Sequence, residues 1–426
     1  MSGTALNSIA ETALRRQVLR QVAHWEGAAE RLDDFEASAS PAAWNSLERY
    51  LGLTLRGELK EAREQLRREA AAVRASYNAA RTQRALELVS DAVSALRDRY
   101  LQTELLVDYY VDAVRSRANP EVGAQLRACD IMAERALTGG LEKLGRPAPP
   151  IMTYFKPGIG AAILRMGTKL WDGSLSRVAA IKLTYHNRLR PTALIHETGH
   201  QFAALTDWND SLARVLRTQL ASAGNDVADH VAGWASEIAA DMFAFAHTGY
   251  GSIAALTDVV SGRGTQVFRF IPGDPHPISF VRVLLGIEMC RRFYGMGPWD
   301  ELESAWRRLH PLTHAGDYVG GLVTAILPLL PRIVDAGLLT PMSGFAGRRL
   351  ADLVDPQRVA PAALRQMQRD AGAAAFTSSH WIWTECLRLT ALSGLRFATE
   401  PESGREILKQ QEDWMVRLGQ LTQQAA

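Results

Sequence analysis

The chain has 426 residues, of which 47% are hydrophobic and 22% charged, a composition typical of a globular protein with two or three domains. Its net charge is only +2, which argues against an electrostatic nucleic-acid-binding surface, so we expect no nucleic-acid partner. Three cysteines, Cys129, Cys290 and Cys386, are far apart and odd in number. No disulfide framework follows from this pattern, which predicts buried free thiols.

The N-terminal segment Met1–Arg20 lacks the apolar stretch of a signal peptide. The longest apolar runs, Gly320–Leu330 and Ala239–Ala246, are shorter than the ~18–20 residues that cross a bilayer. We therefore expect a soluble, cytoplasmic protein without a membrane span. A leaderless export route is compatible with the same sequence.

Residues 1–145 are predicted to be helical, as an antiparallel bundle or a long hairpin. Within 85–115, apolar residues recur at spacings near three, four and seven, and Asn119-Pro120 ends this helix. These apolar residues are Leu88, Ala92, Leu96, Tyr100, Val107, Tyr110 and Val114. The charge-rich segment Leu59–Arg74 is predicted to present a solvated face. We hypothesise that the region gates a cleft, holds a regulatory partner or self-associates.

Residues 146–295 have a different character. Three segments with strand composition, Ile151–Phe155, Ala161–Met166 and Val178–Tyr185, precede a predicted helix that opens at Pro191-Thr192. Residues 296–426 are mainly helical and are predicted to complete a cleft. The predicted fold is therefore mainly α with a small β-sheet, an α+β arrangement.

The most informative motif is the HExxH sequence that runs from His196 to His200 within the predicted helix Ala193–Leu205. Because the two histidines are four residues apart, they lie one turn apart on the same helix face. Two imidazole nitrogens so placed can hold one zinc ion, and Glu197 can take a proton from a water molecule that the ion binds. The motif predicts one zinc ion per chain.

A catalytic zinc ion usually has three protein ligands and one open position. Glu237, in a second predicted helix, is the candidate third ligand. Asp241 is four residues further and points the same way, so it can accept a hydrogen bond from the distal N–H of a zinc-bound histidine. Both acidic residues lie in an otherwise apolar, Ala-rich helix, a costly placement unless each has a partner. The simpler alternative for Asp241 is a helix salt bridge or a cap.

The segment from Asp274 to Arg282 adds an HPxxxxR sequence that starts at His276. The order HExxH, ExxAD, HPxxxxR makes residues 150–290 resemble the gluzincin metalloproteases of the HtpX and CAAX-prenyl-endopeptidase type. The resemblance implies zinc ligands His196, His200 and Glu237, a general base Glu197, an oxyanion-stabilising His276, and an Arg282 that supports that region.

The resemblance also implies a zincin-type metalloprotease core in residues 146–295, flanked by the helical N- and C-terminal regions. Those relatives carry transmembrane helices, whereas we expect none here. The resemblance therefore implies peptidase chemistry on a protein or peptide substrate. Their membrane-protein and prenylated substrates are not carried over to this chain. We expect zinc to activate a water molecule and Glu197 to move its proton to the leaving amine. An extended substrate is expected to pair with the strand near Val178–Tyr185.

Several residues have alternative interpretations. Tyr250 is a rival oxyanion donor, His276 fits a structural His-Pro turn, and Arg282 fits a simple ion pair with Glu288 or a nearby carboxylate. The remaining histidines near these motifs or at i, i+4 spacing are more simply ordinary residues: His230, His247, His310 and His314.

Two alternatives to an active housekeeping peptidase remain at this stage. The chain could be an inactive zincin that serves as a binding or assembly module, although a module has no need of Glu197. It could instead be a delivered toxin or defence effector that cleaves a foreign or host protein.

Overall fold

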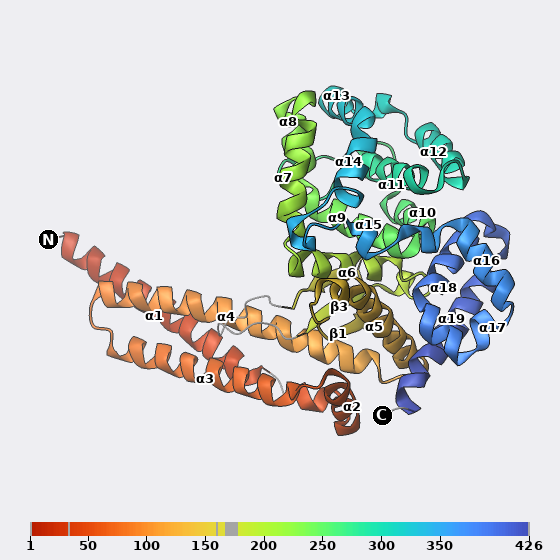
Figure 1. Cartoon of the computed structure of the whole chain (residues 1–426). Helices are drawn as coiled ribbons and strands as arrows, with labels where there is room; N and C mark the ends of the chain where they lie inside the picture. Colours follow the sequence, from red (N-terminus) through yellow and green to blue (C-terminus); the bar gives the residue numbers. More distant parts are fainter. Residues whose placement is uncertain (1, 33–34, 159–160, 167–177, 425–426) are drawn as a thin grey trace. The chain divides into compact units, whose positions relative to one another are not determined.

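The computed structural model describes residues 2–32, 35–158, 161–166 and 178–424. It confirms the predicted fold class, because these residues are mainly helical with one three-stranded sheet (Figure 1). The contacts divide the chain into two compact units, residues 1–118 and a second unit of residues 119–166 and 177–426. The helix that follows Asn119-Pro120, predicted as part of the N-terminal region 1–145, thus belongs to the second unit.

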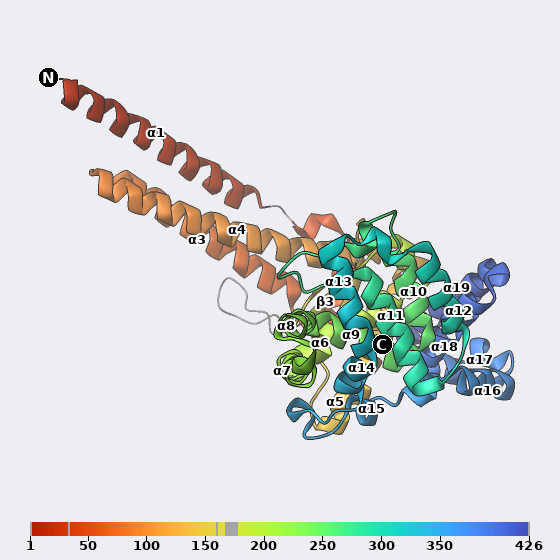
Figure 2. The ribbon, with the colours of Figure 1, turned by 90° about the horizontal axis from the view of Figure 1, so that it is seen from above.

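Three long helices build the first unit. It comprises α1 (Ser2–Arg31), η1 (Phe35–Ser38), α2 (Pro41–Leu51), α3 (Leu55–Ala79) and α4 (Gln83–Ser116). Helices α1, α3 and α4 lie side by side (Figures 1 and 2). They bury a shared aliphatic core that includes Val22, Val73, Val93 and Leu96.

Two helical faces in this unit differ from the prediction. Leu88 of α4 is 54% exposed, because the buried register of this helix passes through Leu86, Val89 and Val93 instead. The charged segment 59–74 lies in α3 and buries an apolar stripe that includes Leu59 and Leu66. Only the remaining faces of that helix are solvated, so its sparse apolar residues are enough to anchor it.

The three predicted strands are present in the second unit as β1 (Ile151–Phe155), β2 (Ala162–Leu164) and β3 (Ala179–Leu183). Strand β3 is central, parallel to β1 and antiparallel to β2. Helix α5 (Pro120–Leu141) packs on β1. The buried Asp130 of α5 accepts hydrogen bonds from the backbone N and Oγ1 of Thr153, both at 2.7 Å, which ties α5 to the sheet.

Helices form the rest of the second unit. In chain order they are α6 (Thr192–Leu205), α7 (Trp208–Leu220), α8 (Asn225–Gly233), α9 (Ala235–Thr248), α10 (Tyr250–Val260), α11 (Ser279–Tyr294), α12 (Pro298–Leu309), α13 (Asp317–Ile326), α14 (Leu330–Leu338), α15 (Leu350–Leu353), α16 (Pro361–Ala371), α17 (Ala374–Thr377), α18 (Ser379–Thr399) and α19 (Gly404–Gln424). Helix α6 follows Pro191, as predicted, and packs on β2 and β3.

The C-terminal residues 296–426 share one hydrophobic core with the other residues of the second unit. Helix α18 packs on α9 and α10, and α19 packs on α5. The predicted buried thiols Cys129, Cys290 and Cys386 are confirmed, since all three are buried and none forms a disulfide. The C-terminal helices α18 and α19 therefore stabilise α5, α9 and α10 by packing against them.

One helical stretch among the described residues, Asp317–Leu338, is long and apolar enough to cross a membrane by length and composition, with a mean hydropathy of 1.5. A single stretch of this kind is weak evidence, because the core helix of a soluble protein meets the same criterion. Its residues Val323, Ile326, Ile333 and Val334 are buried in the protein core. The absence of a membrane span stays a prediction.

Candidate metal centre

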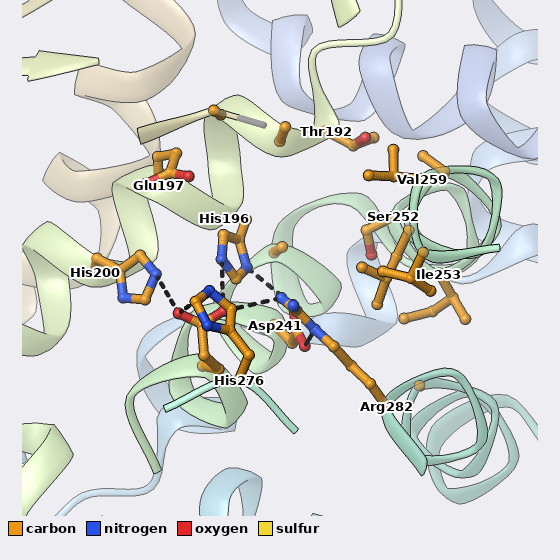
Figure 3. Close-up of a pocket in the computed structure, with 18 of the residues that line it drawn as sticks. Thr192, His196, Glu197, His200, Asp241, Ser252, Ile253, Val259, His276 and Arg282 are labelled. Carbon is orange, nitrogen blue, oxygen red and sulfur yellow. Dashed lines mark hydrogen bonds and ion pairs between the residues drawn. The ribbon is translucent and has the colours of Figure 1, made fainter. Parts of the chain in front are cut away.

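Helices α6 and α9 cross in close contact, and this contact builds the site. Gly199 makes the close approach possible, because a Cβ atom at this position would lie 2.9 Å from the Cα of Ala240. On one side of the contact, His196 and His200 point toward the same region (Figure 3), where they converge with Glu237. The sequence spacing thus translates directly into one cluster.

The three predicted metal ligands present their donor atoms to one point. Nε2 of His196 lies 3.4 Å from Oε2 of Glu237, and Nε2 of His200 lies 3.3 Å from Oε1 of Glu237. One ligand atom from each of the three residues lies within 4.8 Å of the others. Ligands at about 2.1 Å from a tetrahedral ion are separated by roughly 3.4 Å. The group could therefore hold a metal ion.

The second nitrogen of each histidine ring is also engaged. Nδ1 of His196 lies 2.9 Å from Oδ1 of Asp241, which is the contact expected for Asp241. Nδ1 of His200 lies 3.3 Å from Oγ of Ser236. These contacts leave both Nε2 atoms directed toward Glu237 and fix the ring orientations. Sequence analysis missed Ser236, although its place directly before Glu237 on α9 was a usable signal.

Arg282 of α11 joins the two carboxylates. Its Nε and Nη2 donate to Oδ2 and Oδ1 of Asp241 at 2.6 and 2.8 Å, and Nη2 lies 3.2 Å from Oε2 of Glu237. The guanidinium therefore supports the site region, as expected, through a bidentate contact that fixes the orientation of the Asp241 carboxylate. Of the alternative pairings, the one with Glu288 is not formed, whereas the one with a nearby carboxylate is present, to Asp241.

Electrostatics keep the cluster ionised. Burial opposes the charge of Glu237, but hydrogen bonds to His196 and His200 and the charge of Arg282 outweigh it and lower its pKa. Burial likewise opposes the charge of Asp241, yet Arg282 and His196 lower its pKa. Burial also opposes protonation of His196, whereas hydrogen bonds to Asp241 and Glu237 raise its pKa to about 9 in the metal-free protein.

Glu197 lies in a different environment from the two α9 carboxylates. It is buried, lines the same cavity and lies beside the histidines on α6 (Figure 3). Burial raises its pKa, and the nearby His196 and His200 only partly oppose that effect. A raised carboxyl pKa suits a group that must accept and release a proton near neutral pH.

The charges of the cluster fit a divalent cation. With His196 and His200 neutral, as metal-ligating histidines must be, Glu197, Glu237 and Asp241 carry three negative charges when ionised, and Arg282 carries one positive charge. The two remaining negative charges are what a divalent ion neutralises, and two imidazoles with one carboxylate are a donor set that zinc accepts. The predicted residues therefore fit the metal that their motif implies.

His276 reaches the centre from the loop before α11 and is largely exposed, with 62% of its side chain accessible. Its Nε2 lies 3.7 Å from Oε1 of Glu237. Nδ1 and the backbone N of His276 lie 2.7 and 3.0 Å from Oδ1 of Asp274. Asp274 therefore holds the ring with Nε2 toward the centre, a contact that sequence analysis missed.

Tyr250, the rival oxyanion donor, lies away from the cavity. It is buried and its ring packs edge-on against Trp299, with centroids 5.6 Å apart. His247 is buried on the other side of the α6–α9 contact, against Phe243 at a centroid distance of 4.6 Å. His230 faces Tyr318. None of these three side chains reaches the metal-ligand group among the described residues.

A cavity of about 590 Å³ opens at the centre, between α6, α9, α10, α11 and the segment of β2. Its described lining residues all come from residues 161–289. The expectation that residues 296–426 complete the cleft stays a prediction. The expectation of substrate pairing with the strand near Val178–Tyr185 is wrong, because β3 is paired on both sides. Among the described strands, β2 is the edge strand at the cavity, where it contributes Ala162 and Ile163.

Comparison with protein-family models, with curated proteins and with solved structures finds no match to this chain.

Proposed function

We propose that the protein is a zinc-dependent endopeptidase that hydrolyses peptide bonds of protein or peptide substrates. The observation that carries the proposal is the combination of three converging ligand atoms with Glu197 in one cavity. Both histidines also have a partner on the far ring nitrogen. A structural metal site needs no buried carboxylate of raised pKa beside it, whereas a hydrolytic site does.

A zinc ion held by His196, His200 and Glu237 would act as a Lewis acid, lowering the pKa of water toward ~7 and polarising the scissile carbonyl. Asp241, Ser236 and Arg282 orient the ligands for that role. Their hydrogen bonds fix the side chains before substrate arrives, so little reorganisation is needed during the reaction.

Glu197 carries the proton transfer in this proposal. Its carboxylate accepts a proton from the attacking water and passes it to the amine that leaves. The raised pKa supports both steps, because a carboxyl with an ordinary pKa holds the proton too weakly to deliver it near neutral pH.

His276 is the candidate stabiliser of the oxyanion. Asp274 accepts from Nδ1, so the ring presents Nε2 toward Glu237 and the cavity. When both ring nitrogens carry a proton, a ring fixed in this way can donate from Nε2 to the negative charge that develops on the carbonyl oxygen. Its exposed position leaves it reachable by a bound substrate.

The edge strand β2 is the candidate binding site for the substrate backbone. An extended peptide can add to a free strand edge by backbone hydrogen bonds. Ala162 and Ile163 place that edge along the cavity that contains Glu197.

The test measures metal and cleavage on the same preparations. Zinc per chain is measured by elemental mass spectrometry for the wild type, Glu237→Ala and Glu197→Gln, and cleavage is measured on a peptide library and a denatured protein. We expect one zinc per chain in the wild type and in Glu197→Gln, and weaker retention in Glu237→Ala. Cleavage by Glu197→Gln should fall by ~10²–10⁴-fold.

Glu288→Gln is the matched control, because Glu288 is a partly buried carboxyl on α11 outside the cavity. It should retain both zinc and cleavage. Zinc without cleavage in the wild type would favour a binding module, and a chain that takes up no zinc would overturn the proposal.

A further inference from the structure

A second cavity, here called the side cavity, lies next to the cavity at the metal centre and has a volume of about 510 Å³. It is lined by Gly158, His186, Asn187, Arg190, Ala255, Asp258 and Val259. Asn187, Ala255 and Val259 also line the cavity at the metal centre, so the two cavities adjoin. Figure 3 shows Val259 on the side of His196 that is away from His200. A peptide held at the metal centre can therefore extend into the side cavity.

Helix α10 gives the spacing between the two cavities. Ser252 and Ile253, near the start of this helix, line the cavity at the metal centre, whereas Asp258 lines the side cavity. From Ser252 to Asp258 the helix rises by about 9 Å. An extended peptide covers that length in about three residues. The side cavity is thus placed to contact a part of the substrate that does not react.

Two cations and one anion surround the side cavity. Nη1 of Arg190 lies 2.6 Å from Oδ2 of Asp258. Lys182 of β3 adds its ammonium group at the wall, because a Cβ atom at Gly158 would lie 3.4 Å from Nζ of Lys182. Among the described residues, no carboxylate pairs with Lys182. The side cavity therefore has an excess of positive charge.

The guanidinium of Arg190 is held in place and still has N–H groups to offer. Its Cζ lies 4.2 Å from the ring centroid of Phe397 in α18, and this stacking fixes the guanidinium plane before a ligand arrives. Asp258 accepts from Nη1, and no described residue accepts from Nε or Nη2. The side chain of Arg190 is 21% exposed. A planar fork of N–H groups presented in this way matches the geometry of a carboxylate.

Resting on the proposed endopeptidase activity, we propose that the side cavity binds a carboxylate of the substrate about three residues from the scissile bond. Arg190 donates to this carboxylate, and Lys182 adds a second positive charge at the wall. A substrate ammonium group is disfavoured there, because it meets two cations and a single carboxylate that is already paired. Two sources supply such a carboxylate: an acidic side chain within a longer chain, and the free C-terminus of a short peptide.

The first test uses cleavage by the zinc-loaded protein. Cleavage sites are mapped on a peptide library by mass spectrometry, and the best substrate is then synthesised with Glu or its isostere Gln at each position in turn. We expect kcat/KM to be about three- to tenfold higher for Glu at one position, the effect of a partly exposed charged contact. Added salt should reduce this preference.

The same peptides with a free or an amidated C-terminus distinguish the two sources. A preference for Glu that persists in the amidated peptides assigns the side cavity to an acidic side chain. A preference for the free acid over the amide, without any preference for Glu, assigns it to the C-terminus. Both results support the proposal, whereas a preference for Lys over Gln at the same position overturns it.

Two variants break one ion pair with opposite effects on the preference. Arg190→Gln should remove most of it, because the donor is lost. Asp258→Asn should increase it, because Arg190 loses its competing carboxylate. Damage to the fold would instead lower cleavage of the Glu and Gln peptides alike. Arg188→Gln is the matched control, since Arg188 also pairs with a carboxylate, that of Glu412 at 3.2 Å, but lines neither cavity.

A second test does not require cleavage. Alanine-based peptide hydroxamates, extended from the hydroxamate in either chain direction, carry one Glu or one Gln at increasing distance from it. They are titrated into zinc-loaded Glu197→Gln protein, where the hydroxamate anchors them at the metal. The Glu compound should bind about three- to tenfold tighter at one distance, and Lys182→Gln in the same background should reduce the difference.

The outcomes separate the two proposals. Cleavage without a preference for Glu or for a free C-terminus, with equal binding of the paired hydroxamates, overturns the carboxylate site and leaves the peptidase intact. A preference that survives in Arg190→Gln also overturns the carboxylate site. Charge-selective hydroxamate binding without any cleavage supports the carboxylate site and overturns the peptidase. Absence of zinc, cleavage and hydroxamate binding overturns both.

Discussion

The contact between α6 and α9 has two sides, and each buries a histidine in an opposite charge state. On the polar side, hydrogen bonds to Asp241 and Glu237 outweigh burial and raise the pKa of His196 to about 9. On the apolar side, burial lowers the pKa of His247 to about 3, and a hydrogen bond to the backbone of Ala136 only partly opposes it. Burial acts in the same direction on both rings, so the partners decide the outcome.

The difference explains how one pair of helices serves both stability and chemistry. The polar side keeps its charges in the interior only because they are mutually paired. The apolar side provides the packing that holds the helices together, with Phe202 and Phe243 at a centroid distance of 5.0 Å. The aromatic packing on the apolar side thus stabilises the helix contact that positions the charged side chains.

The largest expected effect comes from breaking the polar side at Asp241. Asp241→Asn leaves the buried Arg282 with only Glu237 as a charged partner. We expect the free energy of unfolding of the metal-free protein to fall by ~3 kcal/mol or more, in urea unfolding at pH 7. Asp258→Asn is the control, because Asp258 also pairs with an arginine, Arg190, at 2.6 Å but is 60% exposed.

An exposed pair of this kind contributes at most ~1 kcal/mol. Equal losses for the two variants would contradict the view that the polar side of the contact depends on buried, mutually paired charges.

The second effect concerns the close approach that both sides share. In Gly199→Ala the new methyl group meets the backbone of Ala240 at 2.9 Å and Cβ of Phe243 at 3.0 Å. The helices must separate, so we expect a loss of up to about 3 kcal/mol in thermal or urea unfolding together with weaker zinc retention.

Gly139→Ala is the control, because Gly139 is also helical but a Cβ atom there meets nothing within 4 Å. The greater helix propensity of alanine should leave that variant as stable as the wild type or more stable by up to ~1 kcal/mol. If the two alanines have the same effect, the helices do not depend on contact at Gly199.

Much of the polar side was predictable from sequence, because helix periodicity alone brings His196 and His200 together and likewise Glu237 and Asp241. The three strands were also predictable from composition. Their order was not, since the position of β3 between β1 and β2 depends on contacts distant in sequence. The same reason hid the side cavity, whose walls come from three separate segments.

The third effect tests the apolar side through pH. The unfolded chain protonates His247 near its ordinary pKa of 6.5, whereas the folded protein does so only near 3. Between these values the unfolded state binds the extra proton, so the stabilisation is complete above pH 6.5 and is lost as the pH falls. From pH 6.5 to 5 the wild type should lose about 2 kcal/mol from this group, and His247→Gln should remove that loss.

The comparison of His247→Gln with the wild type isolates His247 in this window, because the raised pKa of Glu197 and the lowered pKa of His310, both caused by burial, contribute to both profiles. The carboxylates with lowered pKa values, Glu237 and Asp241, contribute to the pH dependence only below about 4.5. His196 acts in the opposite direction, because its stabilisation is present below pH 6.5 and is lost as the pH rises toward 9 in the metal-free protein. His380→Gln, at an exposed position, is the control, and its profile should match the wild type.

The smallest expected effect comes from removing the longer of the two contacts to the Nδ1 atoms of the ligand histidines. Ser236→Ala removes the 3.3 Å contact to Nδ1 of His200 but leaves the 2.9 Å contact between His196 and Asp241. Zinc affinity, measured by competition with a chelator, should fall by ~10-fold, the lower end expected for such a loss. Ser211→Ala removes the hydroxyl of a buried serine on α7 that has no contact with the ligands, and should leave the affinity unchanged. An unchanged affinity in Ser236→Ala would mean that the packing of α6 on α9 alone orients His200, and the polar side would then depend on Asp241 as its single positioning contact.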